Sequence, residues 1–351
     1  MLVLELLKWA AAATPSASAE RIASMLGEGH EREVRWALDA GLGPMLYRAT
    51  RDHFECVPSA LRDVLLSSDL TAQVRHACVI DTANEVIDIC RELGTPVTLL
   101  KGISISDQYY PAAHLRPMGD IDVLVPADAS DSVESAMLRR GYSRKPDHDP
   151  SENTRHGVPL FQPRHGVWVE VHTALFERVR PNAVFSSSHI GAQSVASTFH
   201  GRPVNRLTDE LQLLYIASSW IADLSRYGTK IHPSCLPALL DAIFLLKARA
   251  PALDCDAFFG WPENEMAIAS LYVALTYLSK CGLTLCAASI ISRVASSQDI
   301  VGALQLRIIH AILDHYLIGG RPWNHLLPLP VPGRYSMRHQ VRKRWPFRRH
   351  Q

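Results

Sequence analysis

The segment GDIDVLVP, residues 119–126, constrains the fold more strongly than any other part of the sequence. Its apolar residues predict a buried β-strand that ends at a proline, yet it contains two acids, Asp120 and Asp122. Residues two apart in a strand point to the same face of a sheet, so both carboxylates project to one side. Because a buried carboxylate is destabilising unless a cation or hydrogen-bond donors compensate it, the segment predicts a sheet with a charged site on one face.

A third carboxylate occurs in a second strand-like segment, GVWVEVH, residues 166–172. The same alternation places Glu170 and His172 on one face and the valines on the other. If the two strands are neighbours, three acids meet, and their charges repel one another unless a cation lies between them. Oxygen ligands of this kind suit Mg²⁺ or Mn²⁺ bound together with a substrate phosphate. Asp120, Asp122 and Glu170 are therefore candidate metal ligands for phosphoryl or nucleotidyl transfer.

Positive partners for a phosphate group precede these acids in the chain. Lys101 and Gly102 end a short apolar strand, PVTLLK, and supply a cation and a residue that permits close backbone approach. Arg116 is a second cation, four residues before Asp120. Two alternatives remain open: Lys101 pairs with Asp107, and Arg116 forms a structural ion pair with Asp120.

The rest of the chain is mostly helical in pattern. Apolar spacings of three and four predict helices throughout residues 1–94, the last of them ending at Gly94. A strand at 96–101, helices at 104–109 and 131–142, and a hairpin at 157–172 follow, so we expect an α+β fold with a mixed sheet. Further helices are expected near 208–224, 234–249, 263–281 and 284–317. The predicted regions are an N-terminal helical region (1–94), an α/β core (95–175), a C-terminal helical region (176–330) and a flexible basic tail (331–351).

Composition narrows the cellular setting. Seven cysteines without a CxxC pair argue against a disulfide framework and against a cysteine-rich zinc site. No apolar run is long enough for a transmembrane segment, and the N-terminus lacks the features of a signal peptide, so we expect a cytoplasmic protein.

The segment from Arg334 to Gln351 has seven Lys or Arg and no acid. This tail is either a solvated terminus or a contact for nucleic acid, an anionic membrane or an acidic partner.

Several short motifs follow one another within residues 95–175, a quarter of the chain. They are Leu100-Lys101-Gly102, Tyr110-Pro111, Arg116, Asp120-Ile121-Asp122, Gly141-Tyr142 and Glu170-Val171-His172. In this order and spacing they resemble the nucleotidyltransferase superfamily of the DNA polymerase β type, and within it the uncharacterised bacterial nucleotidyltransferases. No P-loop or Rossmann motif is present as an alternative nucleotide site.

The resemblance implies a metal-dependent enzyme that transfers a nucleoside monophosphate from an NTP to an acceptor, with Mg²⁺ or Mn²⁺ as cofactor. It implies that Asp120 and Asp122 bind the metals, and that Glu170 completes the set and helps to deprotonate the acceptor. The chain departs from the family's glycine-serine turn, because Gly102 is followed by an isoleucine and Ser104 is displaced by one residue. The implied residues for nucleotide or phosphate binding are Lys101, Gly102, Ser104, Arg116 and His172.

Three functions remain open at this point. The acceptor of the leading one is unidentified, and family association favours the tailoring of a small molecule, peptide or saccharide product. The second is a non-catalytic module that keeps the fold and binds a nucleotide or a partner. The third is RNA-directed nucleotidyl transfer that uses the basic tail. The role of His172 also remains open among three alternatives: a general base, a nucleotide contact or a buried histidine of the fold.

Overall fold

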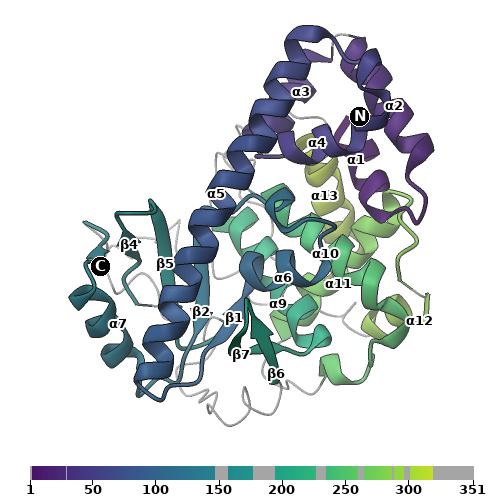
Figure 1. The fold of residues 1–351 in the computed structure, drawn as a ribbon. Coiled ribbons are helices and arrows are strands. Elements are labelled where there is room, and N and C mark those ends of the chain that lie inside the picture. The colour runs from purple at the N-terminus through teal and green to yellow at the C-terminus, as the bar shows by residue number, and fades with distance from the viewer. Residues whose placement is uncertain are drawn as a thin grey trace, which may run out of the picture. The chain divides into compact units, whose positions relative to one another are not determined.

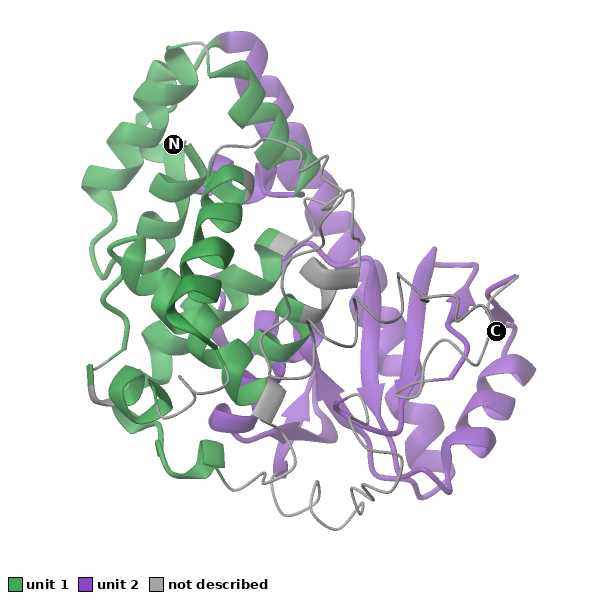
Figure 2. Cartoon of the chain, turned by 180° about the vertical axis from the view of Figure 1, so that it is seen from behind, with its two compact units in different colours: residues 1–40, 49–58, 216–351 green, residues 41–48, 59–215 purple. Residues whose placement is uncertain are grey.

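The computed structural model describes residues 2–28, 30–146, 157–176, 194–226, 235–259, 265–286, 288–295 and 301–318. Two compact units make up the chain, and each is described by itself (Figure 2). Unit 1 comprises residues 1–40, 49–58 and 216–351, and unit 2 comprises residues 41–48 and 59–215. The predicted basic tail, 331–351, lies outside the described residues. Helices together with one mixed sheet confirm the predicted α+β fold class.

Unit 2 contains the sheet, whose described strands follow the order β3-β4-β5-β2-β1-β7-β6. At its centre β2 pairs with β5 in parallel and with β1 in antiparallel orientation, while β1 pairs in parallel with β7. The sheet is therefore mixed, as the sequence predicts. Its strands are β1 (Thr98–Leu100), β2 (Asp120–Leu124), β3 (Ser143–Arg144), β4 (Leu160–Gln162), β5 (Val167–His172), β6 (Ser194–Phe199) and β7 (Arg202–Leu207).

Two helices, α5 (Ser59–Glu92) and α7 (Ser130–Arg139), supply the apolar residues that cover one face of this sheet (Figure 1). Ile121 and Val123 of β2 join the valines of β5 in this core. The helix α5 ends as predicted, because Gly94 adopts a left-handed conformation with φ +65° and Thr95 N donates to Cys90 O at 2.8 Å. The other helices of unit 2 are α4 (Gly43–Thr50, which runs into unit 1), α6 (Lys101–Tyr109), the 3-10 helix η2 (Ala113–Leu115) and the start of α9 (Asp209–Arg226).

Two segments differ from the expectation. The α/β core was expected over 95–175, but the hairpin of β6 and β7 extends the same sheet to Leu207. Its two-residue turn consists of His200 (φ +47°) and Gly201 (φ +78°), both in the left-handed conformation that suits a tight turn between twisted strands.

The prediction of a single helix over 284–317 is wrong. The described residues there form two helices, α12 (Ala288–Val294) and α13 (Ala303–Leu313), and Gly302 has extended backbone before α13.

Unit 1 is helical in its described residues. Lys247 of α10 donates to the carbonyls of Ala10 and Ala12 at 3.0 and 2.7 Å, and so satisfies backbone acceptors at the end of α1. No helix among the described residues is both long and apolar enough to span a membrane. The helices of unit 1 are α1 (Leu2–Ala11), α2 (Ser16–Gly27), α3 (Glu31–Asp39), η1 (Arg51–Cys56), α10 (Cys235–Arg249), η4 (Ala250–Ala252), η5 (Ala257–Phe259), α11 (Glu265–Lys280), α12, α13 and η7 (Asp314–Ile318).

Candidate active site

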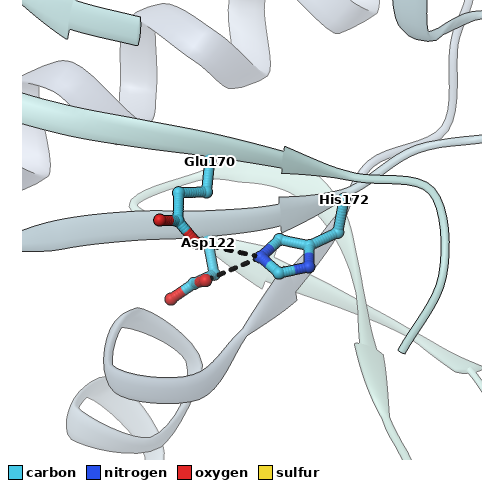
Figure 3. A group of neighbouring side chains, drawn as sticks. All are labelled: Asp122, Glu170 and His172. Atoms are coloured by element: carbon cyan, nitrogen blue, oxygen red, sulfur yellow. Dashed lines mark hydrogen bonds and ion pairs between the residues drawn. The ribbon is translucent and has the colours of Figure 1, made fainter. Parts of the chain in front are cut away.

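The acids of β2 and β5 meet because of the register between these two parallel strands. Asp122 lies opposite Glu170, and Leu124 lies opposite His172. Residues that pair across a sheet share a face, so the polar side chains gather on the side opposite the apolar core. Figure 3 shows Asp122, Glu170 and His172 pointing toward one another from the two strands. The two strands are neighbours, so the condition under which the sequence brings their acids together is met.

Asp122 lies at the centre of this cluster and is buried. Lys101 Nζ donates to Asp122 Oδ1 at 2.6 Å, and His172 Nε2 lies 2.7 Å from the same oxygen. Burial by itself would raise the pKa of Asp122, but the Lys101 ammonium and the His172 hydrogen bond outweigh it and hold this pKa well below its usual range. The carboxylate is therefore ionised at neutral pH.

The ionised state of Asp122 fixes the role of the His172 ring. A carboxylate only accepts hydrogen bonds, so His172 Nε2 carries the hydrogen and donates it. The same nitrogen lies 3.5 Å from Glu170 Oε2. His172 is 1% exposed, and this arrangement makes it a residue that orients the two carboxylates. Burial and the contact with Asp122 agree with the alternative of a buried histidine of the fold, and a role as general base or nucleotide contact stays a prediction.

Lys101 is held in a backbone conformation that few lysines adopt. It is the first residue of α6 and has φ +46°, in the left-handed region that favours glycine. Such a conformation is strained, and its occurrence at a cluster of charges is typical of functional sites. Burial would lower the pKa of Lys101, but Asp122 raises it above its usual value, so the side chain stays charged. The alternative pairing with Asp107 is wrong, because Lys101 contacts Asp122.

Asp120 differs from Asp122 in its surroundings. It begins β2, opposite Trp168, and is exposed. Partial removal of water and the charge of Asp122 raise the pKa of Asp120 to about 6. Its carboxylate is not one of the three groups whose ligand atoms lie within 4.8 Å of one another. Asp120 therefore stands beside the cluster, on the same face of the same strand.

Gly102 leaves room for another side chain, which approaches its backbone closely. A Cβ atom at this position would lie 2.8 Å from Arg116 Cζ and 3.1 Å from Met118 Cγ. Arg116 Nη1 also donates to the carbonyl of Pro117 at 2.6 Å. The guanidinium group is thus fixed against the turn that carries Lys101, so the two cations of the expected phosphate site lie at one place.

Ser104 has partners of another kind. It is fully buried, and its carbonyl accepts a hydrogen bond from Arg206 Nη1 at 2.8 Å. Gln108 also donates to the Ser104 hydroxyl, while Arg206 pairs with Asp107 and thereby joins α6 to β7. These contacts give Ser104 a role in the fold, and its role as a phosphate ligand stays a prediction. Arg206, 2% exposed, was not singled out from the sequence.

Arg75 is a second residue that the sequence pattern did not reveal. From α5 it donates to the carbonyl of Gly166 at 2.8 Å, and its other nitrogen lies 3.5 Å from the carbonyl of Gly119. These two glycines immediately precede β5 and β2, respectively. Arg75 therefore holds the starts of both acid-bearing strands. Its contacts are long-range, and an isolated arginine in a helix carries no signal of them.

The donor set fits a divalent cation. Asp122, Glu170 and His172 each have an atom of a metal-ligating type, and these atoms lie within 4.8 Å of one another. Lys101 and His172 both contact Asp122 Oδ1, and among the described residues no hydrogen bond reaches Oδ2. Carboxylate oxygens suit Mg²⁺ and Mn²⁺, whereas His172 Nε2 carries the hydrogen that it donates to Asp122 and so has no lone pair for a metal. Oδ2 and the Glu170 carboxylate are therefore the ligands that this geometry offers.

Comparison with known proteins adds a family match. The sequence model of a family described as uncharacterised nucleotidyltransferase matches residues 28–264, more than half of the chain. The matched segment contains every residue of the cluster described above, together with Lys101, Gly102 and Arg116. No curated protein matches the chain.

Proposed function

The chain belongs to the uncharacterised nucleotidyltransferase family, and from this premise we propose that it transfers a nucleoside monophosphate from an NTP to an acceptor in a metal-dependent reaction. The observation that carries the proposal is the pairing of Asp122 with Glu170 across two parallel strands, with Asp120 two residues earlier on the same face. A buried, ionised carboxylate beside further carboxylates is stable only with positive charge next to it. Lys101 supplies part of that charge.

The metal ion would be Mg²⁺ or Mn²⁺, held by Asp122, Glu170 and the neighbouring Asp120. Bound there, it would neutralise charge on the phosphates and on the leaving group. His172 would keep the Asp122 carboxylate in place by its hydrogen bond to Oδ1, which leaves Oδ2 for the metal. The involvement of Asp120 requires that it lose its proton, which its pKa of about 6 permits at neutral pH.

Lys101 and Arg116 would bind the triphosphate. Both are cations next to Gly102, whose missing side chain lets the Arg116 guanidinium lie close to the turn that carries Lys101. The reaction itself is a displacement at phosphorus. An acceptor oxygen or nitrogen bonds to the α-phosphorus, the bond to the bridging oxygen breaks, and pyrophosphate leaves with that electron pair. Glu170, partly exposed at the edge of the cluster, would take the proton from the acceptor.

Pyrophosphate release tests the proposal directly. Each NTP is incubated with the protein, Mn²⁺ or Mg²⁺ and pools of small-molecule, peptide and saccharide acceptors, and the product is identified by mass spectrometry. Asp122→Asn keeps the shape of the side chain and removes its charge, and Asp131→Asn, on the exposed start of α7, is the matched control. We expect the first variant to lose turnover by at least a hundredfold and the second to keep it.

The two other functions give different results in the same assay. A non-catalytic module would bind an NTP with its metal, seen as a rise in Tm, and release no pyrophosphate with any acceptor pool. RNA-directed transfer would label RNA and lose that activity when residues 334–351 are deleted. Nucleotide binding that is equal in Asp122→Asn and the unaltered protein would contradict the central proposal.

A further inference from the structure

A groove of about 640 Å³ lies in unit 2, beside the acidic site. One face of α5 forms one of its walls, from Asp63 to Val79, and residues 114–118 form another. All residues that line it belong to unit 2. Its volume is in the range of pockets that bind small molecules. None of the groups assigned above to the metal or to proton transfer lines it.

The groove and the acidic site share a wall. Arg116 and Met118 line the groove, and both side chains also approach Gly102, next to Lys101. Arg75, which also lines it, contacts the carbonyl of Gly119, the residue before Asp120. A molecule in the groove therefore lies next to the start of β2 and to the cations of the predicted phosphate site.

The chemistry of the lining defines the molecule that fits. Most of the surface is apolar, and Val64, which is 46% exposed, offers its side chain to an occupant. Covering such a surface removes apolar area from water, which favours binding. The lining contains two arginines, Arg75 and Arg116, and one acid, Asp63, so the groove favours an anion. Ser67, Ser68 and Thr71 add hydroxyl groups that suit polar substituents.

We propose that this groove binds the acceptor, and that the acceptor is a small molecule with an apolar body and an anionic group. This inference rests on the proposed function. The nucleobase of the NTP is the competing occupant. Among the described residues no Phe, Tyr or Trp lines the groove; its aromatic rings are the smaller imidazoles of His76 and His114, and His114 is held by Asp69. The groove therefore lacks the large aromatic platform on which bases usually stack. The anionic group lies near the arginines, and the reacting hydroxyl or amine extends past Arg116 toward Glu170.

Three probes with one apolar body test the proposal: 4-phenylbutyrate, 4-phenylbutyl phosphate and the neutral 4-phenylbutan-1-ol. Binding is measured by ligand-observed NMR on the full chain with Mn²⁺ and a non-hydrolysable ATP analogue present. Thr71→Trp fills the groove, and Leu70→Trp, its neighbour on α5 outside the lining and 53% exposed, is the matched control. The two anionic probes separate a carboxylate from a phosphate as the preferred group.

We expect at least one anionic probe to bind at least tenfold more tightly than the alcohol. That binding should fall at least tenfold in Thr71→Trp, stay unchanged in Leu70→Trp, and show enhanced relaxation of the probe by the Mn²⁺ ion. Failure of all three probes to bind, equal binding to Thr71→Trp, equal affinity for the alcohol, or competition with the ATP analogue would each overturn the proposal. Binding of the analogue with Mn²⁺ is scored separately, so failure of the acceptor site is distinguishable from failure of the proposed function.

Discussion

The Lys101 ammonium and the Asp122 carboxylate form an ion pair of 2.6 Å at the place where a metal ion would bind. A metal ion bound to Asp122 would compete with the Lys101 ammonium for the same carboxylate, and so it would weaken the attraction that holds Lys101 there. The lysine would then be available for a phosphate. Metal and nucleotide binding would in this way be linked through a single side chain.

Replacement of Lys101 by methionine should therefore have opposite effects on the two ligands. Without nucleotide, we expect Lys101→Met to bind Mn²⁺ more tightly, on the order of tenfold, which corresponds to about 1.4 kcal/mol. With Mn²⁺ saturating, the affinity for an NTP should fall, because a phosphate partner is lost. Titration followed by electron paramagnetic resonance of free Mn²⁺ measures the first, and calorimetry measures the second.

The exposed Lys145, close to β3, provides the control, and Lys145→Met should leave both affinities unchanged. Weaker Mn²⁺ binding by Lys101→Met in the absence of nucleotide would show that the lysine supports the metal site rather than competing for it. Without metal, Lys101→Met should also be less stable than the unaltered protein, because loss of the ammonium leaves the buried charge of Asp122 without its positive partner. Mn²⁺ should then raise its Tm more than it raises that of the unaltered protein.

Asp120 should make folding stability depend on pH when no metal is present. Its pKa is about 6 in the folded protein, against 3.8 for an aspartate in the unfolded chain. Between these pH values the folded chain keeps a proton that the unfolded chain has released, so the contribution of Asp120 becomes less favourable as the pH rises. We expect Asp120→Asn to be more stable than the unaltered protein above pH 6 and equal to it below pH 4. Because Asp120 is exposed, the difference should be under about 1 kcal/mol.

Urea unfolding in EDTA at intervals from pH 4 to pH 7.5 measures this difference, and addition of Mn²⁺ at pH 7.5 should reverse its sign. A constant difference across the pH range would contradict the assignment of the raised pKa to Asp120.

The polar face of the sheet was predictable because strand alternation is a local property. Once Asp120, Asp122 and Glu170 are placed on strands, period two decides which face each side chain occupies, and the apolar residues between them require that the other face be buried. The end of α5 was predictable for the same reason, since Gly94 acts through its own backbone conformation. The order of elements around the site follows from such local signals.

Contacts between distant segments were not predictable from local pattern. The hairpin of β6 and β7 was missed because β6 is largely exposed and weakly apolar, although the His200-Gly201 turn was a usable signal. The pairing of Lys101 with Asp122 instead of Asp107 depends on the position of Arg206, which takes Asp107. The groove beside Arg116 depends on where α5 packs. Each of these needs the three-dimensional arrangement of segments far apart in the sequence.

Gly102→Ala should separate nucleotide binding from stability. The added Cβ would lie 2.8 Å from the Arg116 guanidinium, the mobile end of a long side chain, so the fold adjusts by moving Arg116. Because alanine favours a helix more than glycine does, by up to about 1 kcal/mol, Tm should stay equal or rise. Affinity for an NTP with Mn²⁺ should fall about tenfold as Arg116 leaves its place. Calorimetry and thermal unfolding measure the two quantities.

A double-variant cycle tests the cause of that loss. If Gly102→Ala acts by moving Arg116, the combination of Gly102→Ala with Arg116→Ala should bind no more weakly than Arg116→Ala alone. Additive losses would show instead that the alanine methyl group itself obstructs the phosphate.

Arg75 should act on the metal site through the strands that it holds. It lies across the starts of β2 and β5 by its contacts with the carbonyls of Gly119 and Gly166, and those strands set Asp122 opposite Glu170. We expect Arg75→Ala to weaken Mn²⁺ binding about three- to tenfold and to lower stability by about 1–3 kcal/mol, the contribution of hydrogen bonds from a charged donor. Arg75→Lys keeps the charge but has a single nitrogen in place of the two that contact the two carbonyls, so it should recover part of the stability. The Mn²⁺ affinity is measured at a temperature at which both variants are fully folded. A residue that positions the two acids must alter how they bind the ion. An unchanged affinity would therefore limit Arg75 to a role in stability.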